Sequence, residues 1–227
     1  MITQNSLATN FSALNFSKLE SLMNASFFNA EAAYAYRSAT NVKRKNNLLI
    51  KTTILDANAK DRAEVEAFVA DIFANAYGAK IQHFMPHLVA LRDENNMLVA
   101  AFGLRQAYAE PLFLEQYLDT SVETLLSSRL GKKYGREQIT EIGNLAVANP
   151  RNAGVLITSV INYSLISGVQ WCVCTAHHTL QNALIKGGRE VIALQIADKN
   201  RLPAKELENW GSYYQNAPQI VAVRGVI

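Results

Sequence analysis

Three consecutive pieces of sequence decide the fold: Glu141-Ile-Gly-Asn-Leu-Ala-Val147, the turn Asn149-Pro-Arg-Asn-Ala-Gly154, and the apolar run from Val155 to Ser167. The first is typical of a strand, the second of a turn and the third of a buried helix. A glycine-containing turn that opens a helix directs several backbone N–H groups at one point, which suits a phosphate. Glu141 would lie beside whatever that phosphate carries. The stretch therefore indicates an acyl-carrier thioester held next to a base, and hence a transferase.

The composition is that of an ordinary globular protein. Of the 227 residues, 49% are apolar and 18% are charged, and the net charge is +3. This charge is too small to indicate a nucleic-acid partner, and we interpret the basic cluster 43–45 as a solvated surface run. Residues 1–24 lack the basic start and apolar core of a secretory signal.

The two cysteines, Cys172 and Cys174, lie two positions apart in a segment with strand character. This spacing does not favour a disulfide between them, and no Cys/His spacing suited to a metal is visible. We therefore expect buried thiols, no metal and a reducing, cytoplasmic location.

A long charge-free stretch allows a second interpretation. Residues 152–185 contain no Asp, Glu, Lys or Arg, which is long enough to suggest a membrane segment. The stretch is interrupted by Gly168 and also contains polar residues, among them Thr158, Ser159, Asn162, Ser164, Ser167, Gln170 and Thr175. A buried helix that leads into a buried central strand gives the same pattern, and we favour that interpretation.

The order of the expected elements predicts one α/β domain with a mixed sheet, covering residues 47–227. Residues 1–46 are expected to be an N-terminal appendage, flexible or partly helical over residues 18–36. Strands are expected at 48–55, 87–92, 97–105, 141–147, 169–176, 190–197 and 219–227, and helices at 65–76, 112–118, 121–130, 155–167, 179–186 and 203–214.

This order of elements resembles the GNAT acyltransferase superfamily. In that superfamily a central strand and the following helix splay apart to admit the pantetheine arm of an acyl-CoA. The pyrophosphate loop there has a basic or glutamine residue, two variable positions, glycine, one variable position, then glycine or alanine. Arg151 and Gly154 match the first basic position and the first glycine, whereas Leu156 departs from the last position. The resemblance implies a GNAT-like, acyl-CoA N-acyltransferase fold with a mixed central sheet flanked by helices.

Three stretches carry a more specific resemblance: Gly103-Leu-Arg105, the segment 111–119 and the strand that starts at Glu141. They look like motifs of the acyl-homoserine-lactone synthase branch, which makes autoinducers. In that branch an arginine follows the strand carboxylate three positions later. This chain has Asn144 there, which puts the substrate and activity of the synthases in doubt.

The family known as thermostable hemolysin is similar over residues 60–227. Its name implies a membrane-active protein but does not follow from any residue here. The matching motifs are Phe84-Met-Pro86, Leu112-Phe-Leu-Glu-Gln-Tyr-Leu-Asp119, Glu141-Ile-Gly-Asn-Leu-Ala146, Thr175-Ala176, and Trp210-Gly211 with Tyr213-Tyr214.

Glu141 is the first candidate for catalysis, as the base that takes a proton from an attacking amine. The alternative is a structural carboxylate paired with Arg105 or another base. Arg105 ends an apolar strand and needs a partner, so it is either a carboxylate clamp or structural. Glu115 and Asp119, four apart on an expected helix, are expected either to receive a cationic acceptor amine or to form a solvated face.

The donor is expected to lie along the strand and the turn. Gly143 fits either a bulge that frees backbone groups for the pantetheine arm or a close-packing glycine. Arg151 and the following N–H groups would hold the pyrophosphate, or else the turn is an ordinary Asn-Pro cap. The residues expected to bind the cofactor are Leu145, Ala146, Val147, Arg151, Asn152, Ala153 and Gly154.

Further residues near the expected site have a structural interpretation as well. His177 and His178 follow the cysteine-containing strand and are interpreted as a polar cap more readily than as catalytic groups. Tyr163 and the aromatic cluster 210–214 are interpreted as packing or as one wall of an acyl pocket.

These observations predict an acyltransferase that moves an acyl group from acyl-CoA or an acyl-carrier protein to a small amine by direct attack on the thioester. The alternatives are a membrane-active hemolysin-type protein, or a GNAT-like domain that binds a ligand without chemistry. The expected partners are the amine and, for the donor, coenzyme A or the carrier protein. No nucleic acid or membrane partner is expected, a homodimer is left open, and the relatives imply a bacterial cytoplasmic enzyme.

Overall fold

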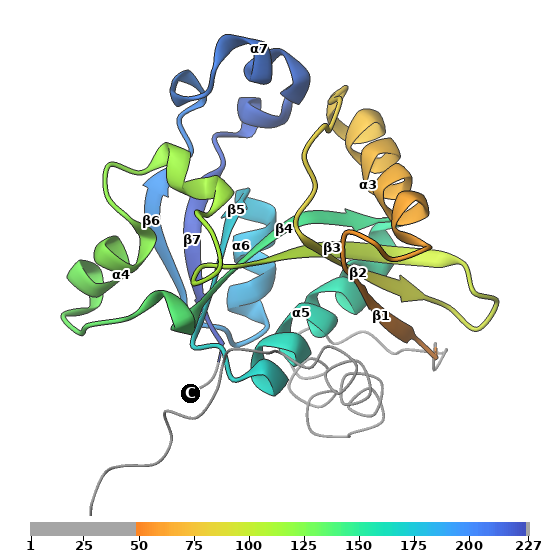
Figure 1. Cartoon of the computed structure of the whole chain (residues 1–227), viewed down its shortest axis with the longest axis horizontal. Coiled ribbons are helices and arrows are strands. Elements are labelled where there is room, and N and C mark those ends of the chain that lie inside the picture. Colours follow the sequence, from red (N-terminus) through yellow and green to blue (C-terminus); the bar gives the residue numbers. More distant parts are fainter. Residues whose placement is uncertain (1–48, 226–227) are drawn as a thin grey trace, which may run out of the picture.

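A seven-stranded mixed sheet forms the centre of the structure, a computed structural model in which residues 49–225 are described (Figure 1). The strand order is β1-β2-β3-β4-β5-β7-β6; the β4–β5 pair is parallel and the other pairs are antiparallel. The expected appendage, residues 1–46, and its helix lie outside the described residues. The strands are β1 (Lys51–Leu55), β2 (His87–Arg92), β3 (Leu98–Gln106), β4 (Ile139–Val147), β5 (Trp171–Ala176), β6 (Val191–Ile196) and β7 (Gln219–Arg224).

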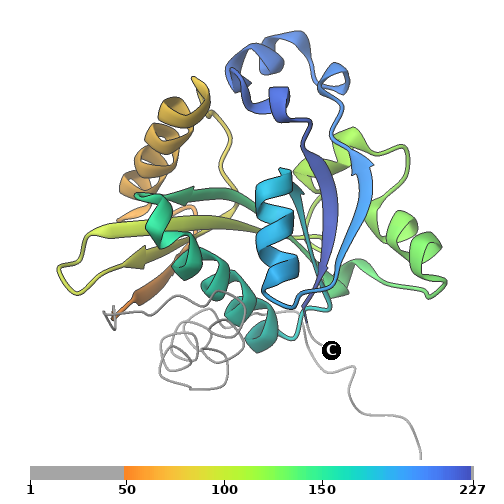
Figure 2. The same cartoon turned by 180° about the vertical axis from the view of Figure 1, so that it is seen from behind.

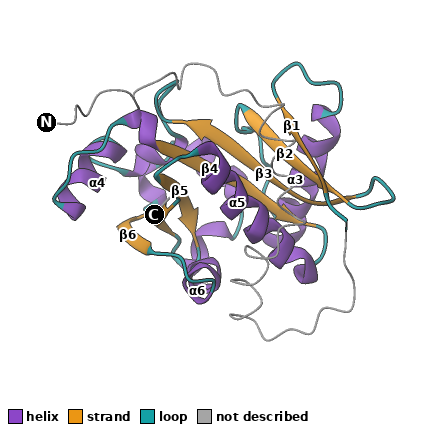
Figure 3. Cartoon of the chain, turned by 90° about the horizontal axis from the view of Figure 1, so that it is seen from below, coloured by secondary structure: helices purple, strands orange, loops and turns teal. Residues whose placement is uncertain are grey.

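Helices cover both faces of the sheet (Figures 2 and 3). Helix α3 (Arg62–Tyr77) buries Val65, Val69 and Phe73 against one face, and ends at Gly78 in the left-handed conformation with φ 67°. Helices α5 (Ala153–Ser167) and α6 (His178–Lys186) pack on the other face. The remaining helical segments are η1 (Phe113–Tyr117), α4 (Val122–Leu130), η2 (Arg136–Gln138), η3 (Pro150–Asn152), η4 (Lys199–Arg201), α7 (Ala204–Leu207), η5 (Glu208–Trp210) and η6 (Tyr213–Asn216).

This architecture confirms the predicted GNAT-like mixed α/β fold. Strand β2 and the α3 pattern lie where the sequence places them, and the charge-free stretch forms α5, β5 and most of α6. Its buried side chains belong to the core of the sheet. Within residues 49–225, the longest apolar helices fall short of what a membrane crossing requires.

The single helix expected over 203–214 is wrong. The segment forms α7, η5 and η6, and the break lies at Gly211, whose φ is 52°. A Cβ at Gly211 would lie 2.1 Å from the Tyr77 carbonyl oxygen, because the segment is pressed against the end of α3. Two backbone hydrogen bonds hold it there: Ser212 N–H donates to the Tyr77 carbonyl (2.8 Å), and Lys80 N–H donates to the Asn209 carbonyl (2.6 Å).

Strand β4 separates from β5 partway along its length and carries a bulge on its β3 side. Its parallel register with β5 covers three positions, from Ile139 to Glu141, while β4 itself continues to Val147. On the β3 side, the register jumps from Gly103↔Gly143 to Ala101↔Ala146. The extra residue on β4 is a bulge, which frees backbone groups beside the point where β4 and β5 separate.

Candidate active site

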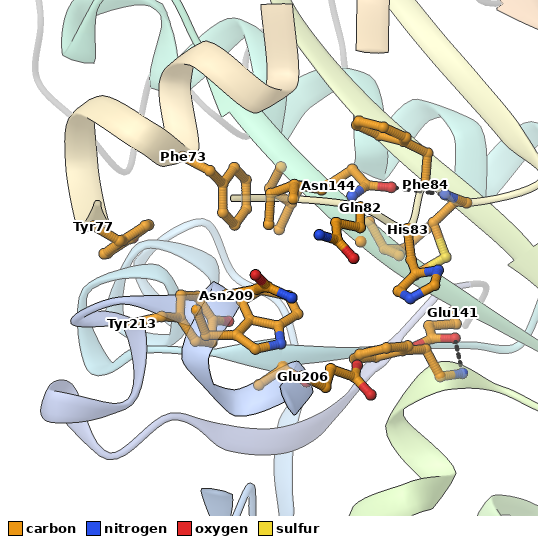
Figure 4. Close-up of a pocket in the computed structure, with 18 of the residues that line it drawn as sticks. Phe73, Tyr77, Gln82, His83, Phe84, Glu141, Asn144, Glu206, Asn209 and Tyr213 are labelled. Atoms are coloured by element: carbon orange, nitrogen blue, oxygen red, sulfur yellow. Dashed lines mark hydrogen bonds between the residues drawn. The ribbon is translucent and has the colours of Figure 1, made fainter. Parts of the chain in front are cut away.

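A cavity of about 240 Å³ lies over the point where β4 and β5 separate (Figure 4). One wall comes from β4 and β5, a second from the end of α3 and the loop after it, and a third from residues 206–214. The lining is Phe73, Tyr77, Lys80, Ile81, Gln82, His83, Phe84, Met85, Arg105, Phe113, Tyr117, Glu141, Ile142, Gly143, Asn144, Leu145, Thr175, His177, Leu180, Glu206, Asn209, Trp210, Tyr213 and Tyr214.

Glu141 lines this cavity and is itself only 3% exposed. Its two carboxyl oxygens accept hydrogen bonds from the backbone N–H groups of Phe113 (2.8 Å) and Leu114 (3.0 Å), at the start of η1. Burial raises the pKa of Glu141 to about 7, against the opposing effect of these two N–H groups and of Arg105. A carboxyl group with this pKa is half ionised near neutral pH, which suits a group that takes and returns a proton.

Arg105 lies directly opposite Glu141 in the β3–β4 register. Its Nη1 donates to the Pro111 carbonyl at 3.3 Å, and its Nε lies 3.8 Å from a carboxylate oxygen of Glu110. The structure therefore brings two of the three predicted catalytic residues to one cavity. The partner of Arg105 is Glu110, at a long distance, with Glu141 close enough to feel its charge.

Glu115, the third predicted catalytic residue, lies away from this cavity. Its carboxylate pairs with Arg136 (2.7 Å) and accepts the N–H groups of Leu112 and Val122. Burial raises its pKa, but the Arg136 hydrogen bond and these N–H groups outweigh that effect and lower the pKa overall. Asp119 pairs with Arg201 (2.6 Å) beyond the end of η1. The expected shared helix face of Glu115 and Asp119 is not present, because η1 ends at Tyr117.

Asn144 lies in the bulge of β4. Asn144 has a φ of 49°, a conformation that asparagine tolerates better than most residues, and its Oδ1 accepts the Met85 N–H (2.8 Å). Gly143 packs against the same methionine, since a Cβ there would lie 2.3 Å from Met85 Cε. Gly143 therefore adjoins a bulge and also packs closely, and the role of the bulge in binding a pantetheine arm stays a prediction.

The turn before α5 has the geometry of an Asn-Pro cap. The Asn149 side chain accepts the Arg151 N–H (2.9 Å), the Asn149 carbonyl accepts the Asn152 N–H (2.8 Å), and the Pro150 carbonyl accepts the Ala153 N–H. Two of the three N–H groups expected to hold a pyrophosphate are thus used within the turn. The Arg151 side chain is exposed at the end of β4, and its role stays a prediction.

The three strand residues expected to touch the donor lie in three different environments. Leu145 lines the cavity, whereas Ala146 packs under α3 and Val147 packs against the core on the α5 side. Leu145 also lines a second, smaller apolar cavity of about 40 Å³ between α5 and α6, together with Ile142 and Leu180. The two cavities therefore meet at the gap between β4 and β5.

His177 faces the cavity, and His178 does not line it. The His177 ring lies 4.7 Å from that of Tyr213 and 5.9 Å from that of Tyr77, and its buried Nε2 has no hydrogen-bond partner among residues 49–225. Burial lowers the pKa of His177, so its ring is neutral near pH 7. The aromatic cluster 210–214 forms a wall of the cavity and also packs against the core; its contact with an acyl chain stays a prediction.

Sequence reasoning missed the wall made by α3 and the loop after it. Phe73 and Tyr77 face the cavity from the last turns of α3, and His83 and Met85 from the loop (Figure 4). The motif Phe84-Met-Pro86 was a signal for this wall, because it combines large apolar residues with a proline outside any expected element. Within residues 49–225, no group of three or more His, Cys, Asp or Glu side chains is placed to hold a metal ion.

Three solved structures are similar to this one across most of its length. FeeM, described as an N-acyl amino acid synthase from uncultured soil microbes, has a TM-score of 0.53 and 17% identity over 79% of this chain and 92% of its own. BjaI, a CoA-dependent acyl-homoserine lactone synthase solved with SAM and isopentyl-CoA, has a TM-score of 0.52 and 17% identity, over 78% of this chain and 83% of its own. The AHL synthase LasI has a TM-score of 0.51 and 12% identity, over 78% of this chain and 96% of its own.

At these identities the likeness establishes the shared fold. No curated protein matches the sequence. A family model described as thermostable hemolysin matches residues 55–226, which includes every residue that lines the cavity. The chain therefore belongs to the thermostable hemolysin family, on a GNAT-like fold shared with acyl-homoserine-lactone synthases.

Proposed function

We propose that this protein is an acyltransferase that moves an acyl group from a thioester, carried by coenzyme A or a carrier protein, to a small amine. The observation that carries the proposal is the Glu141 carboxyl group, buried in the wall of the cavity with a pKa of about 7. A proton acceptor of this kind at the separation of two parallel strands fits an amine that attacks a thioester held in the gap.

The donor arm would enter the gap between β4 and β5. Beyond Glu141 the paired register of the two strands ends, and the bulge at Asn144 frees further backbone groups for hydrogen bonds to an amide-rich arm. Arg151, exposed at the end of β4, would attract the phosphates. The small apolar cavity between α5 and α6 adjoins the gap and suits methylene groups.

Two relatives support this choice of donor. BjaI is described as CoA-dependent and FeeM as an N-acyl amino acid synthase, so the same fold joins acyl donors to amines in those proteins. Neither description decides between coenzyme A and a carrier protein for this chain. We therefore propose a phosphopantetheine thioester, which both donors share.

The proposed reaction uses these groups in turn. The amine nitrogen attacks the thioester carbonyl carbon, Glu141 accepts a proton from that nitrogen directly or through a water molecule, the C–S bond breaks, and the thiolate is protonated to the free thiol. The freed backbone N–H groups of β4 would stabilise the negative charge that develops on the carbonyl oxygen. The cavity positions the amine, which supplies a further part of the rate enhancement.

Binding of the donor tests the proposal directly. Calorimetry with octanoyl-CoA and with an octanoyl-carrier protein is expected to give saturable binding of at least one donor. Replacement of Arg151 by Gln is expected to weaken it about fivefold, the equivalent of roughly 1 kcal/mol, and a bulky Gly154→Trp variant is expected to weaken it further. Arg129, an exposed arginine on α4, provides the matched control in Arg129→Gln. Absence of binding to both donors by a folded protein would overturn the proposal.

The family name implies membrane damage, which a dye-leakage assay with liposomes tests separately. Leakage caused equally by the wild type and by Glu141→Gln would show an activity independent of the proposed chemistry. A protein that binds thioesters, causes no leakage and turns over no amine would instead fit the binding-only alternative.

A further inference from the structure

The proposed function describes the acceptor only as a small amine. The surroundings of Arg105 indicate which other chemical group this acceptor carries. We infer that the acceptor is an amino acid or a similar amino carboxylate, whose carboxylate is bound by Arg105 while its amine faces Glu141. This inference rests on the proposed function for the amine, and on Arg105 alone for the carboxylate.

The Arg105 side chain is mostly buried, and few of its N–H groups have a hydrogen-bond partner among the described residues. Its side chain is 18% exposed, and its Nε is a buried atom with no hydrogen-bond partner among the described residues. Its contacts are one hydrogen bond of 3.3 Å to the Pro111 carbonyl and the 3.8 Å approach to Glu110. A guanidinium group carries five N–H donors in a planar fork, so most of this capacity is available.

The arginines that hold the fold together look different. Arg136 makes hydrogen bonds of 2.6 to 3.2 Å to Glu115, Glu123 and two backbone carbonyls. Arg62 likewise binds Glu66 and the backbone carbonyls of 85 and 86 at 2.7 to 2.8 Å. A structural role therefore gives short, multiple contacts in this protein, and Arg105 lacks them within residues 49–225.

The two carboxyl groups nearest to Arg105, Glu110 and Glu141, leave room for an anionic ligand, and a third carboxyl group, Glu206, lines the same two hollows. Glu110 is 43% exposed, so solvent screens its attraction for the guanidinium. Both oxygens of Glu141 accept backbone N–H groups, and this carboxyl is half neutral near pH 7. A carboxylate with two oxygens in one plane would match the unused fork of Arg105.

Arg105 and Glu141 lie side by side on one face of the sheet. Residues directly opposite on antiparallel strands point to the same face, with Cα atoms about 4.5 to 5.5 Å apart. Arg105 and Glu141 both line the main cavity, and Arg105 also lines an adjoining, more open hollow with His83 and Gln82. An amino carboxylate could enter through that hollow and meet Arg105 first.

Binding of reaction products tests this inference without requiring turnover. The probes are N-octanoyl-phenylalanine and its carboxamide, which differ only in the charge of the carboxyl group. Each would be titrated calorimetrically into the full-length wild type, Arg105→Gln, Arg105→Lys and the control Arg129→Gln, with thermal melting to confirm folding. Octanoyl-CoA binding by each variant would be measured in parallel.

The wild type is expected to bind the acid about 10- to 100-fold more tightly than the carboxamide, as a desolvated charge-assisted pair would produce. Arg105→Gln is expected to remove this preference, Arg105→Lys to restore part of it, and Arg129→Gln to keep it. Equal affinity for the two probes, a preference that survives Arg105→Gln, or binding of neither probe would overturn the inference. Absence of wild-type binding to both octanoyl-CoA and an octanoyl-carrier protein would overturn the proposed function instead, so the two failures are distinguishable.

Discussion

Replacement of Glu141 by Gln is the most informative perturbation, because it removes the ionisable proton at nearly constant shape. If Glu141 takes the proton from the amine, kcat/KM should fall by about 10²- to 10⁴-fold, or roughly 3 to 5 kcal/mol in the barrier. The measurement is release of free thiol from octanoyl-CoA in the presence of an amine. Affinity for octanoyl-CoA should change little, because Glu141 would contact the amine rather than the donor arm.

In the same variant, we expect the free energy of unfolding to depend on pH differently from that of the wild type. Burial raises the pKa of Glu141 from 4.5 to about 7 in the folded protein, so the folded state holds this proton more tightly than the unfolded state does. The stabilising contribution is therefore full below pH 4.5 and is lost as pH rises to 7, by an amount on the order of 3 kcal/mol. In urea unfolding, the wild type should lose this stability relative to Glu141→Gln between pH 5 and 8.

Two features keep this test interpretable. Gln keeps one acceptor oxygen for the N–H groups of Phe113 and Leu114 but presents an NH₂ group to the other, which should cost about 1 to 3 kcal/mol of stability. Glu94→Gln, in the exposed turn between β2 and β3, is the matched control. A folded Glu141→Gln protein that retains activity within threefold, or whose stability follows pH as the wild type does, would refute the reasoning.

Three further predictions concern the surroundings of the site. Glu115→Gln should lower the free energy of unfolding by about 1 to 3 kcal/mol, because it weakens the ion pair with Arg136. The affinity for octanoyl-CoA should stay constant. A loss of this affinity without a loss of stability would indicate that Glu115 takes part in binding after all. Asn144→Gly should preserve more stability in urea unfolding than Asn144→Ala, since only glycine adopts φ 49° without cost; the reverse order would contradict this account of the bulge. Burial raises the pKa of Cys172 and Cys174 to about 12, so thiol reagents should label them only on unfolding, and rapid native labelling would contradict that burial.

The sequence predicts the elements whose signals are local. The α3 periodicity with Gly78 at its end, the turn at 93–96 and the charge-free α5–β5 pair each combine a regular pattern with a clear stop, and all are found. The helix expected at 203–214 fails for a tertiary reason. Its sequence is compatible with a continuous helix, but contact with the Tyr77 carbonyl forces Gly211 out of helical geometry.

The candidate site was predictable only in part, and for a similar reason. Glu141 and Arg105 could be found because both are charged residues on apolar strands. The partner of Glu115 could not, because Arg136 lies 21 positions away and reaches it only through the packing of η1 and η2. The wall from Phe73 to Met85 depends on how α3 crosses the sheet, which no local pattern specifies.

The contact that forces the break at Gly211 also fixes when the cavity can exist. Its aromatic wall is joined to the end of α3 by hydrogen bonds between residues 135 positions apart, Tyr77 and Ser212. On a ribosome, residues 206–214 emerge only after strands β1 to β6 have been made. A nascent chain can thus assemble most of its sheet while it still lacks a complete chamber for a ligand. Capture of a small molecule would then report that residues 206–214 have docked on the end of α3.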